Sequence, residues 1–189
     1  MNFTKSKELQ RKSHALIPGG AHTYAKGDDQ YPEEAPGFIC RGEGCHVWDV
    51  DGKQYYDFLS GYSAVNQGHC HPRIVQALME QAQKLTLTSR AFHSDLLGEY
   101  VKFITAYFGY DKVLPMNTGV EAVETGVKLC RKLAYEVKGI AADKATIIVC
   151  EGNFHGRTSA VISFSSDPLA KKNFGPYMPG FKVIPYNDT

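Results

Sequence analysis

The spacing of hydrophobic positions divides the first part of the chain into a helix, a polar stretch and short strands. Residues 6–16 carry two leucines among lysines and arginines, which predicts a short exposed helix that ends at Pro18-Gly19-Gly20. Residues 21–36 are mostly polar and contain two prolines, so they predict a loop or arm on a surface. A small antiparallel sheet is then predicted, with Asp51-Gly52 suited to a hairpin turn and β-prone runs at 38–39, 46–48 and 55–58.

Apolar residues then recur at helical spacing and later alternate between helix and strand patterns. A stripe that begins at Pro72 predicts one helix, and Ser94 and Gly109 are suited to begin and end the next one. Further on, the pattern predicts a long helix over 120–137 and strands at 112–115, 146–150 and 182–184. Because strands that alternate with helices form parallel sheets with crossover helices, the second part of the chain predicts an α/β fold.

The composition is that of an ordinary globular protein. Of the 189 residues, 43% are hydrophobic and 22% are charged, and 21 Lys and Arg residues nearly balance 20 Asp and Glu residues to a net charge of +1. This balance argues against a nucleic-acid partner, and no apolar run approaches the ~20 residues of a membrane span. The start of the chain lacks a hydrophobic signal core, and the five cysteines form no Cys-x-x-Cys pair. We therefore expect a cytoplasmic enzyme or binding domain.

Residues 117–122 lie at the junction between a predicted strand and the long helix. Thr118 offers a hydroxyl group, and Gly119 lets the backbone approach a ligand closely. Free N–H groups at a helix start attract anions, so this stretch is a candidate anion site. The alternative is a plain helix cap formed by Asn117 or Thr118.

Residues 151–158 follow a predicted apolar strand, where open α/β sheets bind their ligands. Phe154 stands among small and polar neighbours, a position better suited to stacking on a flat ring than to a core. Arg157 could form a bidentate pair with a carboxylate or phosphate. The alternative is a surface turn with an incidental aromatic residue.

Residues 60–72 contain the triplet His69-Cys70-His71, which suggests a metal site. Adjacent residues on an irregular segment rarely ligate one ion, and no second cluster has the spacing of a zinc site, so we expect no metal here. Cys45-His46 is the pair that could complete such a set. The competing hypothesis is a turn that shapes the wall of a pocket, with Tyr62 presenting its hydroxyl group.

Residues 117–122 and 152–158 resemble the phosphate-cup and ring-stacking motifs of the class III aminotransferases, which are pyridoxal 5'-phosphate (PLP) enzymes of fold type I. From about Asp57 to its end, the chain is similar to the ornithine branch of this class, a match carried by residues 62–72, 85–92 and 174–181. The first stretch of the chain, residues 17–32, looks more like the glutamate-semialdehyde aminomutase branch.

The resemblance implies which residues bind the cofactor. The backbone N–H groups of Gly119 and Val120 would hold the PLP phosphate, with Thr118 beside them. Phe154 would lie against the pyridine ring, and His155, which replaces a tryptophan of the animal ornithine enzymes, would also contact the cofactor.

The resemblance also implies a substrate and an assembly. Arg157 would bind the substrate carboxylate, and Tyr62 would help to select the substrate side chain. The reaction would move the δ-amino group of ornithine to 2-oxoglutarate and give glutamate and glutamate semialdehyde. An acetylornithine aminotransferase or an aminomutase of the same class is the alternative. Because fold-type I sites are built at a dimer interface, a homodimer is expected.

The implied fold is a fold-type I α/β transferase, represented here by a truncated part. Residues 1–56 would form an N-terminal arm and a small β-sheet segment, and residues 57–189 the first part of the large PLP-binding domain. The family's Schiff-base lysine and the aspartate that pairs with the pyridine nitrogen belong to a later part of its chains, so no catalytic residue is assigned. We expect the 189 residues alone to be inactive; a non-catalytic remnant that folds, dimerises or binds phosphate is the rival hypothesis.

Overall fold

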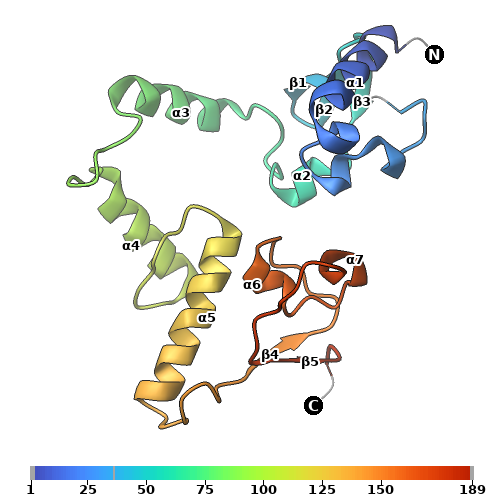
Figure 1. Cartoon of the computed structure of the whole chain (residues 1–189). Coiled ribbons are helices and arrows are strands. Elements are labelled where there is room, and N and C mark those ends of the chain that lie inside the picture. The colour runs from blue at the N-terminus through green and yellow to red at the C-terminus, as the bar shows by residue number, and fades with distance from the viewer. Residues whose placement is uncertain (1–2, 36, 188–189) are drawn as a thin grey trace. The chain divides into compact units, whose positions relative to one another are not determined.

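The computed structural model describes residues 3–35 and 37–187 (Figure 1). The chain divides into two compact units, residues 1–94 (unit 1) and residues 95–189 (unit 2), and each is described by itself. The predicted division at residue 57 stays a prediction. Within the described ranges, no helix combines the length and the apolar character that crossing a membrane requires.

Unit 1 begins with helix α1 (Thr4–Leu16), which confirms the predicted first helix. Three short 3₁₀ turns follow: η1 (Pro18–Gly20), η2 (Tyr24–Lys26) and η3 (Asp28–Gln30). They confirm the predicted loop as far as residue 35, and its last position, residue 36, lies outside the described residues.

Strands β1 (Ile39–Glu43), β2 (His46–Asp49) and β3 (Gln54–Tyr56) form an antiparallel sheet in the order β1-β2-β3, as predicted. Helix α1 is hydrogen-bonded to the turn between β2 and β3. The Asp51 carboxylate in this turn accepts hydrogen bonds from the Lys5 and Ser6 amides at 2.9 and 3.0 Å. Phe3, Val47 and Asp49 are buried at this junction. The small core of unit 1 therefore joins the first helix to the sheet.

A sharp turn, α2 (Ser60–Ser63), and helix α3 (Pro72–Lys84) complete unit 1. Pro72 occupies the first turn of α3, where its missing N–H would have had no partner within the helix. The helix predicted from Pro72 onward is thus confirmed.

Unit 2 opens with helix α4 (Leu96–Phe108), which Gly109 ends in the left-handed conformation (φ 71°) as predicted. Asp95, and not Ser94, holds the N-cap position. Helix α5 (Gly119–Glu136) confirms the predicted long helix within one residue at each end.

The sheet of unit 2 pairs β4 (Ile147–Cys150) with β5 (Phe181–Ile184) in parallel, with Ile147 opposite Phe181. Two short helices, α6 (Ser159–Ile162) and α7 (Pro168–Lys171), lie along the chain between the strands (Figure 1). Two of the predicted strands and the parallel α/β arrangement are confirmed. Phe164 is the centre of the core and packs on Phe181 with ring centroids 4.4 Å apart.

The predicted strand at 112–115 is wrong. These residues have no regular secondary structure. A strand needs a hydrogen-bonded neighbour, and among the described residues the sheet of unit 2 consists of β4 and β5. An apolar sequence without a partner strand therefore stays irregular here.

Candidate functional site

Thr118 is the N-cap residue of helix α5 and forms a capping box with Glu121. The Thr118 hydroxyl oxygen accepts a hydrogen bond from the Glu121 amide at 3.2 Å, and the Glu121 carboxylate accepts one from the Thr118 amide at 3.1 Å. Thr118, rather than Asn117, is the capping residue, and the predicted anion site at this helix start stays a prediction.

Capping leaves the next two amides available to a ligand. Gly119 and Val120 are the first two residues of α5, and N–H groups in these positions have no acceptor within their own helix. A side-chain atom added at Gly119 would meet nothing within 4 Å, so a ligand reaches this backbone through open space. Since Glu121 brings a negative charge to the same turn, an anion here would be held by directed N–H groups rather than by net positive charge.

The loop after β4 is held by its own polar side chains. The Asn153 side-chain amide donates to the carbonyl oxygens of Cys150 at 2.7 Å and Phe164 at 3.0 Å. The Gly152 amide donates to the Ser166 hydroxyl at 2.8 Å. These bonds fix the backbone immediately before Phe154, a residue that is 79% exposed. The ring stands outside the core, as predicted.

The same loop packs against the first turns of α5. Gly156 has φ of 120°, and a Cβ there would lie 2.8 Å from Cγ2 of Val120, so a larger residue does not fit. Two residues further on, the Thr158 hydroxyl donates to the Glu124 carboxylate. The structure therefore brings the two predicted motifs, 117–122 and 152–158, into contact within unit 2.

The two neighbours of Gly156 differ in what they face. The His155 ring lies against Phe164, with centroids 5.7 Å apart, so it contacts the core of unit 2. Arg157 is exposed, and in residues 3–35 and 37–187 no carboxylate pairs with its guanidinium group. Arg157 is thus available to an acidic ligand, as its predicted role requires.

Tyr62 belongs to unit 1 and is 72% exposed. It lies in the α2 turn, which agrees with the predicted turn. Further along, Gln67 and residues 69–72 line a shallow pocket together with residues 42–44. Tyr62 does not itself line this pocket, and its predicted contact with a substrate stays a prediction.

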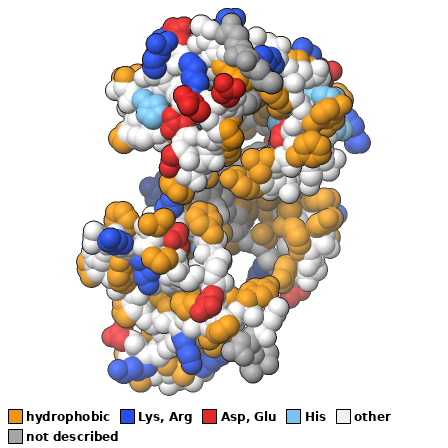
Figure 2. All heavy atoms as spheres, turned by 90° about the vertical axis from the view of Figure 1, so that its right-hand side faces the viewer, with side chains coloured by type: hydrophobic (Ala, Val, Ile, Leu, Met, Phe, Trp, Pro, Cys, Tyr) orange, Lys and Arg blue, Asp and Glu red, His pale blue; other side chains and the backbone are white. Residues whose placement is uncertain are grey.

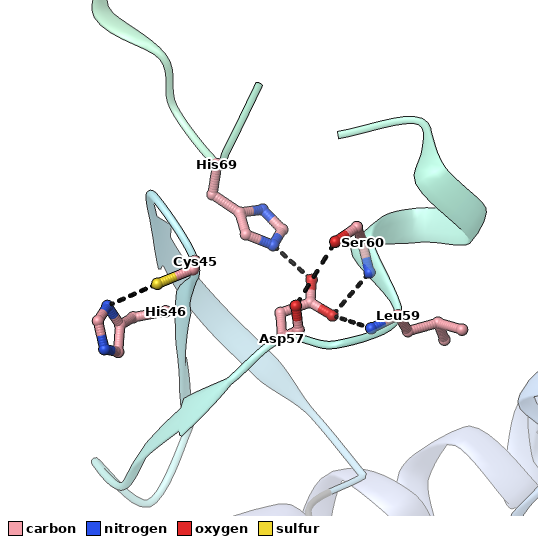
Figure 3. Close-up of polar contacts among 6 residues, drawn as sticks. All are labelled: Cys45, His46, Asp57, Leu59, Ser60 and His69. Carbon is pink, nitrogen blue, oxygen red and sulfur yellow. Dashed lines mark hydrogen bonds and ion pairs between the residues drawn. The ribbon is translucent and has the colours of Figure 1, made fainter. Parts of the chain in front are cut away.

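His69 forms an ion pair with Asp57, with 2.6 Å between Nε2 and the carboxylate oxygen (Figure 3). The hydrogen bond from His69, and after it the one from the Ser60 amide, lower the pKa of Asp57 below its usual value. Across the described part of the chain, no group of three or more His, Cys, Asp or Glu side chains is arranged to hold a metal ion.

The sequence pattern places Asp57 in a strand and so does not predict the Asp57–His69 pair; strand β3 ends at Tyr56. One local signal could have predicted the contacts of Asp57 with the backbone. An aspartate followed by Ser60 three residues later is typical of a turn in which the carboxylate accepts backbone N–H bonds. The pairing with His69 spans 12 residues and has no such local signal.

The chain matches a known family over most of its length. The family model described as "Aminotransferase class-III" matches residues 28–189. The chain is 54% identical over 169 residues to a probable mitochondrial ornithine aminotransferase of Caenorhabditis elegans, covering 89% of this chain and 38% of that protein. It is 50% identical to the ornithine aminotransferase of Plasmodium falciparum over 189 residues, covering 100% of this chain and 44% of that protein.

Solved structures of aminotransferases are also similar to this chain. An ornithine aminotransferase from Toxoplasma gondii matches 97% of this chain and 41% of its own with a TM-score of 0.85 and 44% identity. An acetylornithine aminotransferase from Elizabethkingia anophelis matches the same shares with a TM-score of 0.72 and 57% identity. The chain spans 36–44% of the length of the curated relatives that it matches.

Proposed function

The chain belongs to the class III aminotransferase family, and from this premise we propose that it forms part of a PLP-dependent ornithine aminotransferase. Its α/β fold is that of the first part of the fold-type I PLP-dependent transferases. The family uses PLP, and one solved relative from Toxoplasma gondii is described with PLP partially occupying its active site. The ornithine assignment is supported by relatives of that name at 50–58% identity.

The contact between the Phe154 loop and the first turn of α5 carries this proposal. It brings together an open pair of N–H donors at Gly119 and Val120 and an exposed aromatic ring on a fixed backbone. PLP needs these two features, a phosphate site and a surface for its flat ring. The residues present therefore fit the cofactor.

Each residue has a binding or orienting task in the proposed site. The Gly119 and Val120 amides would donate to the phosphate, and the Thr118 hydroxyl, whose oxygen already accepts from Glu121, keeps its proton for the same group. The Phe154 ring would cover one face of the pyridine and exclude water from it. When bound, PLP supplies the electron sink for amino-group transfer.

The substrates are proposed to be L-ornithine, as donor of its δ-amino group, and 2-oxoglutarate, with glutamate semialdehyde and glutamate as products. Arg157 is unpaired among the described residues and would fix a substrate carboxylate by a bidentate contact. Tyr62 would contact the substrate side chain. A homodimer and a cytoplasmic location complete the proposal.

The second candidate is an acetylornithine aminotransferase. The 57% identity to the Elizabethkingia anophelis enzyme favours it, because that value exceeds the 44% identity to the Toxoplasma gondii ornithine enzyme. Initial rates with L-ornithine and with N-acetylornithine, each with 2-oxoglutarate, separate the two. We expect the higher kcat/KM for L-ornithine, and a reversed order would replace the ornithine assignment.

Cofactor binding is tested by titrating the complete gene product with PLP and following its absorbance. Gly156→Ala should weaken PLP binding because the added Cβ meets Val120. Gly152→Ala is the matched control, since Gly152 also has positive φ (70°) but a Cβ there meets nothing within 4 Å. Equal losses in both variants would show that backbone strain, and not the contact with α5, matters.

The 189 residues contain no assigned catalytic residue. We propose that they bind PLP without transaminating, because no lysine here matches the context of the family's Schiff-base lysine. Assaying the 189-residue chain beside the complete gene product checks this, and ornithine-dependent turnover by the shorter chain would contradict it.

A further inference from the structure

The turn that carries Tyr62 has a left-handed backbone over four consecutive residues. The φ angles are 50° at Ser60, 57° at Gly61, 58° at Tyr62 and 68° at Ser63. For residues other than glycine this conformation costs roughly 1–2 kcal/mol each, so it occurs mostly at single positions. A run of this kind persists only where surrounding contacts hold it.

The Asp57 carboxylate supplies such contacts at the start of the run and links this start to His69. One oxygen accepts hydrogen bonds from the amides of Leu59, just before the left-handed run, and Ser60, its first residue, both at 2.9 Å. The other oxygen binds His69 Nε2 at 2.6 Å, beyond the run (Figure 3). The side chains of Asp57 and His69 are 17% and 26% exposed, so water competes little for these bonds.

His69 is itself held by the three-stranded sheet. Its backbone exchanges two hydrogen bonds with Gly44, at 3.0 and 2.8 Å. Its ring lies directly over Gly42, where an added Cβ would come within 2.7 Å of the imidazole Cγ. His69 therefore connects Asp57 to the end of strand β1, since this strand ends at Glu43, next to Gly44.

We propose that Asp57 and His69 are positioning residues that hold the left-handed turn so that Tyr62 is presented for substrate selection. This inference rests on the proposed function, in which Tyr62 contacts the substrate side chain. Neither residue needs to touch the substrate. Their effect is transmitted through the backbone of residues 59–62.

The test compares variants in the PLP-loaded complete gene product. Asp57→Ala removes all three acceptor contacts, and Asp57→Asn keeps an acceptor for the two amides if the first variant does not fold. The matched control is Asp28→Ala, because Asp28 also pairs with a histidine of unit 1, His14, at 2.7 Å, but lies outside the 57–69 segment. Hydrogen exchange at the Leu59 and Ser60 amides should accelerate in Asp57→Ala, accelerate less in Asp57→Asn, which keeps an acceptor oxygen, and stay unchanged in Asp28→Ala.

The functional readout is the ratio of kcat/KM for L-ornithine to that for L-lysine, which has the same α-amino and α-carboxylate groups but a side chain one methylene longer. A displaced Tyr62 should lower this ratio by about tenfold or more, mainly through KM, since a misplacement of ~1 Å has effects of this order. The absorbance of bound PLP should not change.

A double variant shows whether Asp57 acts through Tyr62. Adding Asp57→Ala to Tyr62→Ala should lower the ratio no further than Tyr62→Ala alone. If Tyr62→Ala lowers the ratio and Asp57→Ala and Asp57→Asn leave it unchanged, the positioning inference is wrong and the proposed function stands. If Tyr62→Ala itself leaves the ratio unchanged, the proposed role of Tyr62 fails, and the positioning inference fails with it.

Discussion

Asp49 has no exposed surface, yet it carries a carboxylate in the core of unit 1. One oxygen accepts from the Lys53 amide at 2.8 Å and the other from the Tyr55 hydroxyl at 2.8 Å. Burial by itself raises the pKa of Asp49, but the hydrogen bonds from Lys53, Tyr55 and the Asp51 backbone outweigh it and hold the pKa below its usual value. A buried charge of this kind is tolerated only while these donors remain in place.

Replacing Tyr55 should therefore destabilise the protein. Burial, and then the hydrogen bond to Asp49, raise the pKa of Tyr55 to about 12, so its hydroxyl stays protonated and donates at neutral pH. Tyr55→Phe leaves an Asp49 oxygen without that donor and should lower the free energy of unfolding by about 1–3 kcal/mol. Urea unfolding measures this. Tyr56→Phe is the control, since Tyr56 is 66% exposed, and equal losses in the two variants would contradict the role given to Asp49.

The Asp57–His69 pair makes part of the stability depend on pH. The pKa of Asp57 is lower in the folded protein, first because of the hydrogen bond from His69 and then because of the Ser60 amide. A carboxyl group with a lowered folded pKa contributes stability above its unfolded pKa of about 3.9, and this contribution is lost as the pH falls through the folded value. Urea midpoints measured from neutral to acidic pH should fall less steeply below about pH 5 in Asp57→Asn than in the unchanged protein. Parallel curves for the two proteins would contradict this assignment.

Among the elements, helices α1, α3, α4 and α5 could be predicted, whereas the short helices α6 and α7 and the lack of a strand at 112–115 could not. Helix α5 has its own capping box and a periodic apolar face, so local sequence determines where it starts. Residues 112–115 look like a strand because they are apolar, but whether they pair depends on a neighbour far along the chain.

In the candidate site, too, local features could be predicted from the sequence and long-range contacts could not. The motif at Thr118 and the exposed ring of Phe154 follow from local sequence. The fit of Gly156 against Val120 joins positions 36 residues apart, and no pattern within either motif predicts it. Long-range hydrogen bonds, such as those from the Lys5 and Ser6 amides to Asp51, could not be predicted for the same reason.

The start of α5 permits a test that removes one N–H donor and little else. Gly119→Pro deletes the amide proton at the first helical position, where proline is well tolerated, and the preceding Thr118 is already extended (φ −142°, ψ 161°), as a residue before proline must be. A hydrogen bond to a charged group is worth about 1.5–3 kcal/mol, so PLP should bind roughly 10–100-fold more weakly.

Gly119→Ala is the matched control for this change, because it keeps the N–H group and adds a Cβ into open space. Its affinity for PLP should stay close to that of the unchanged protein. Equilibrium titration followed by absorbance measures both variants. If proline and alanine weaken binding equally, the Gly119 amide does not hold the phosphate.

At the scale of the whole molecule, both units leave much apolar surface uncovered (Figure 2). In unit 2, Phe103, Tyr107 and Phe108 of α4 are 63%, 71% and 60% exposed, and the Tyr107 ring packs against the rings of the other two residues. In unit 1, Ile74 and Leu78 of α3 are 56% and 68% exposed. Contiguous apolar surface on this scale marks faces that another part of a protein or a second chain covers.

The exposed α4 face leads to a prediction about association. The 189 residues by themselves should bind a hydrophobic dye and sediment above 20.9 kDa, with a mass that rises with concentration, because their apolar faces cover one another non-specifically. The complete gene product should bind little dye and sediment at twice its chain mass, as the proposed homodimer requires. Phe103→Lys should reduce dye binding by the 189 residues, whereas Lys102→Gln, a change of an exposed polar side chain on the same helix, should not. A 20.9 kDa monomer that binds no dye would show that these faces are not association surfaces.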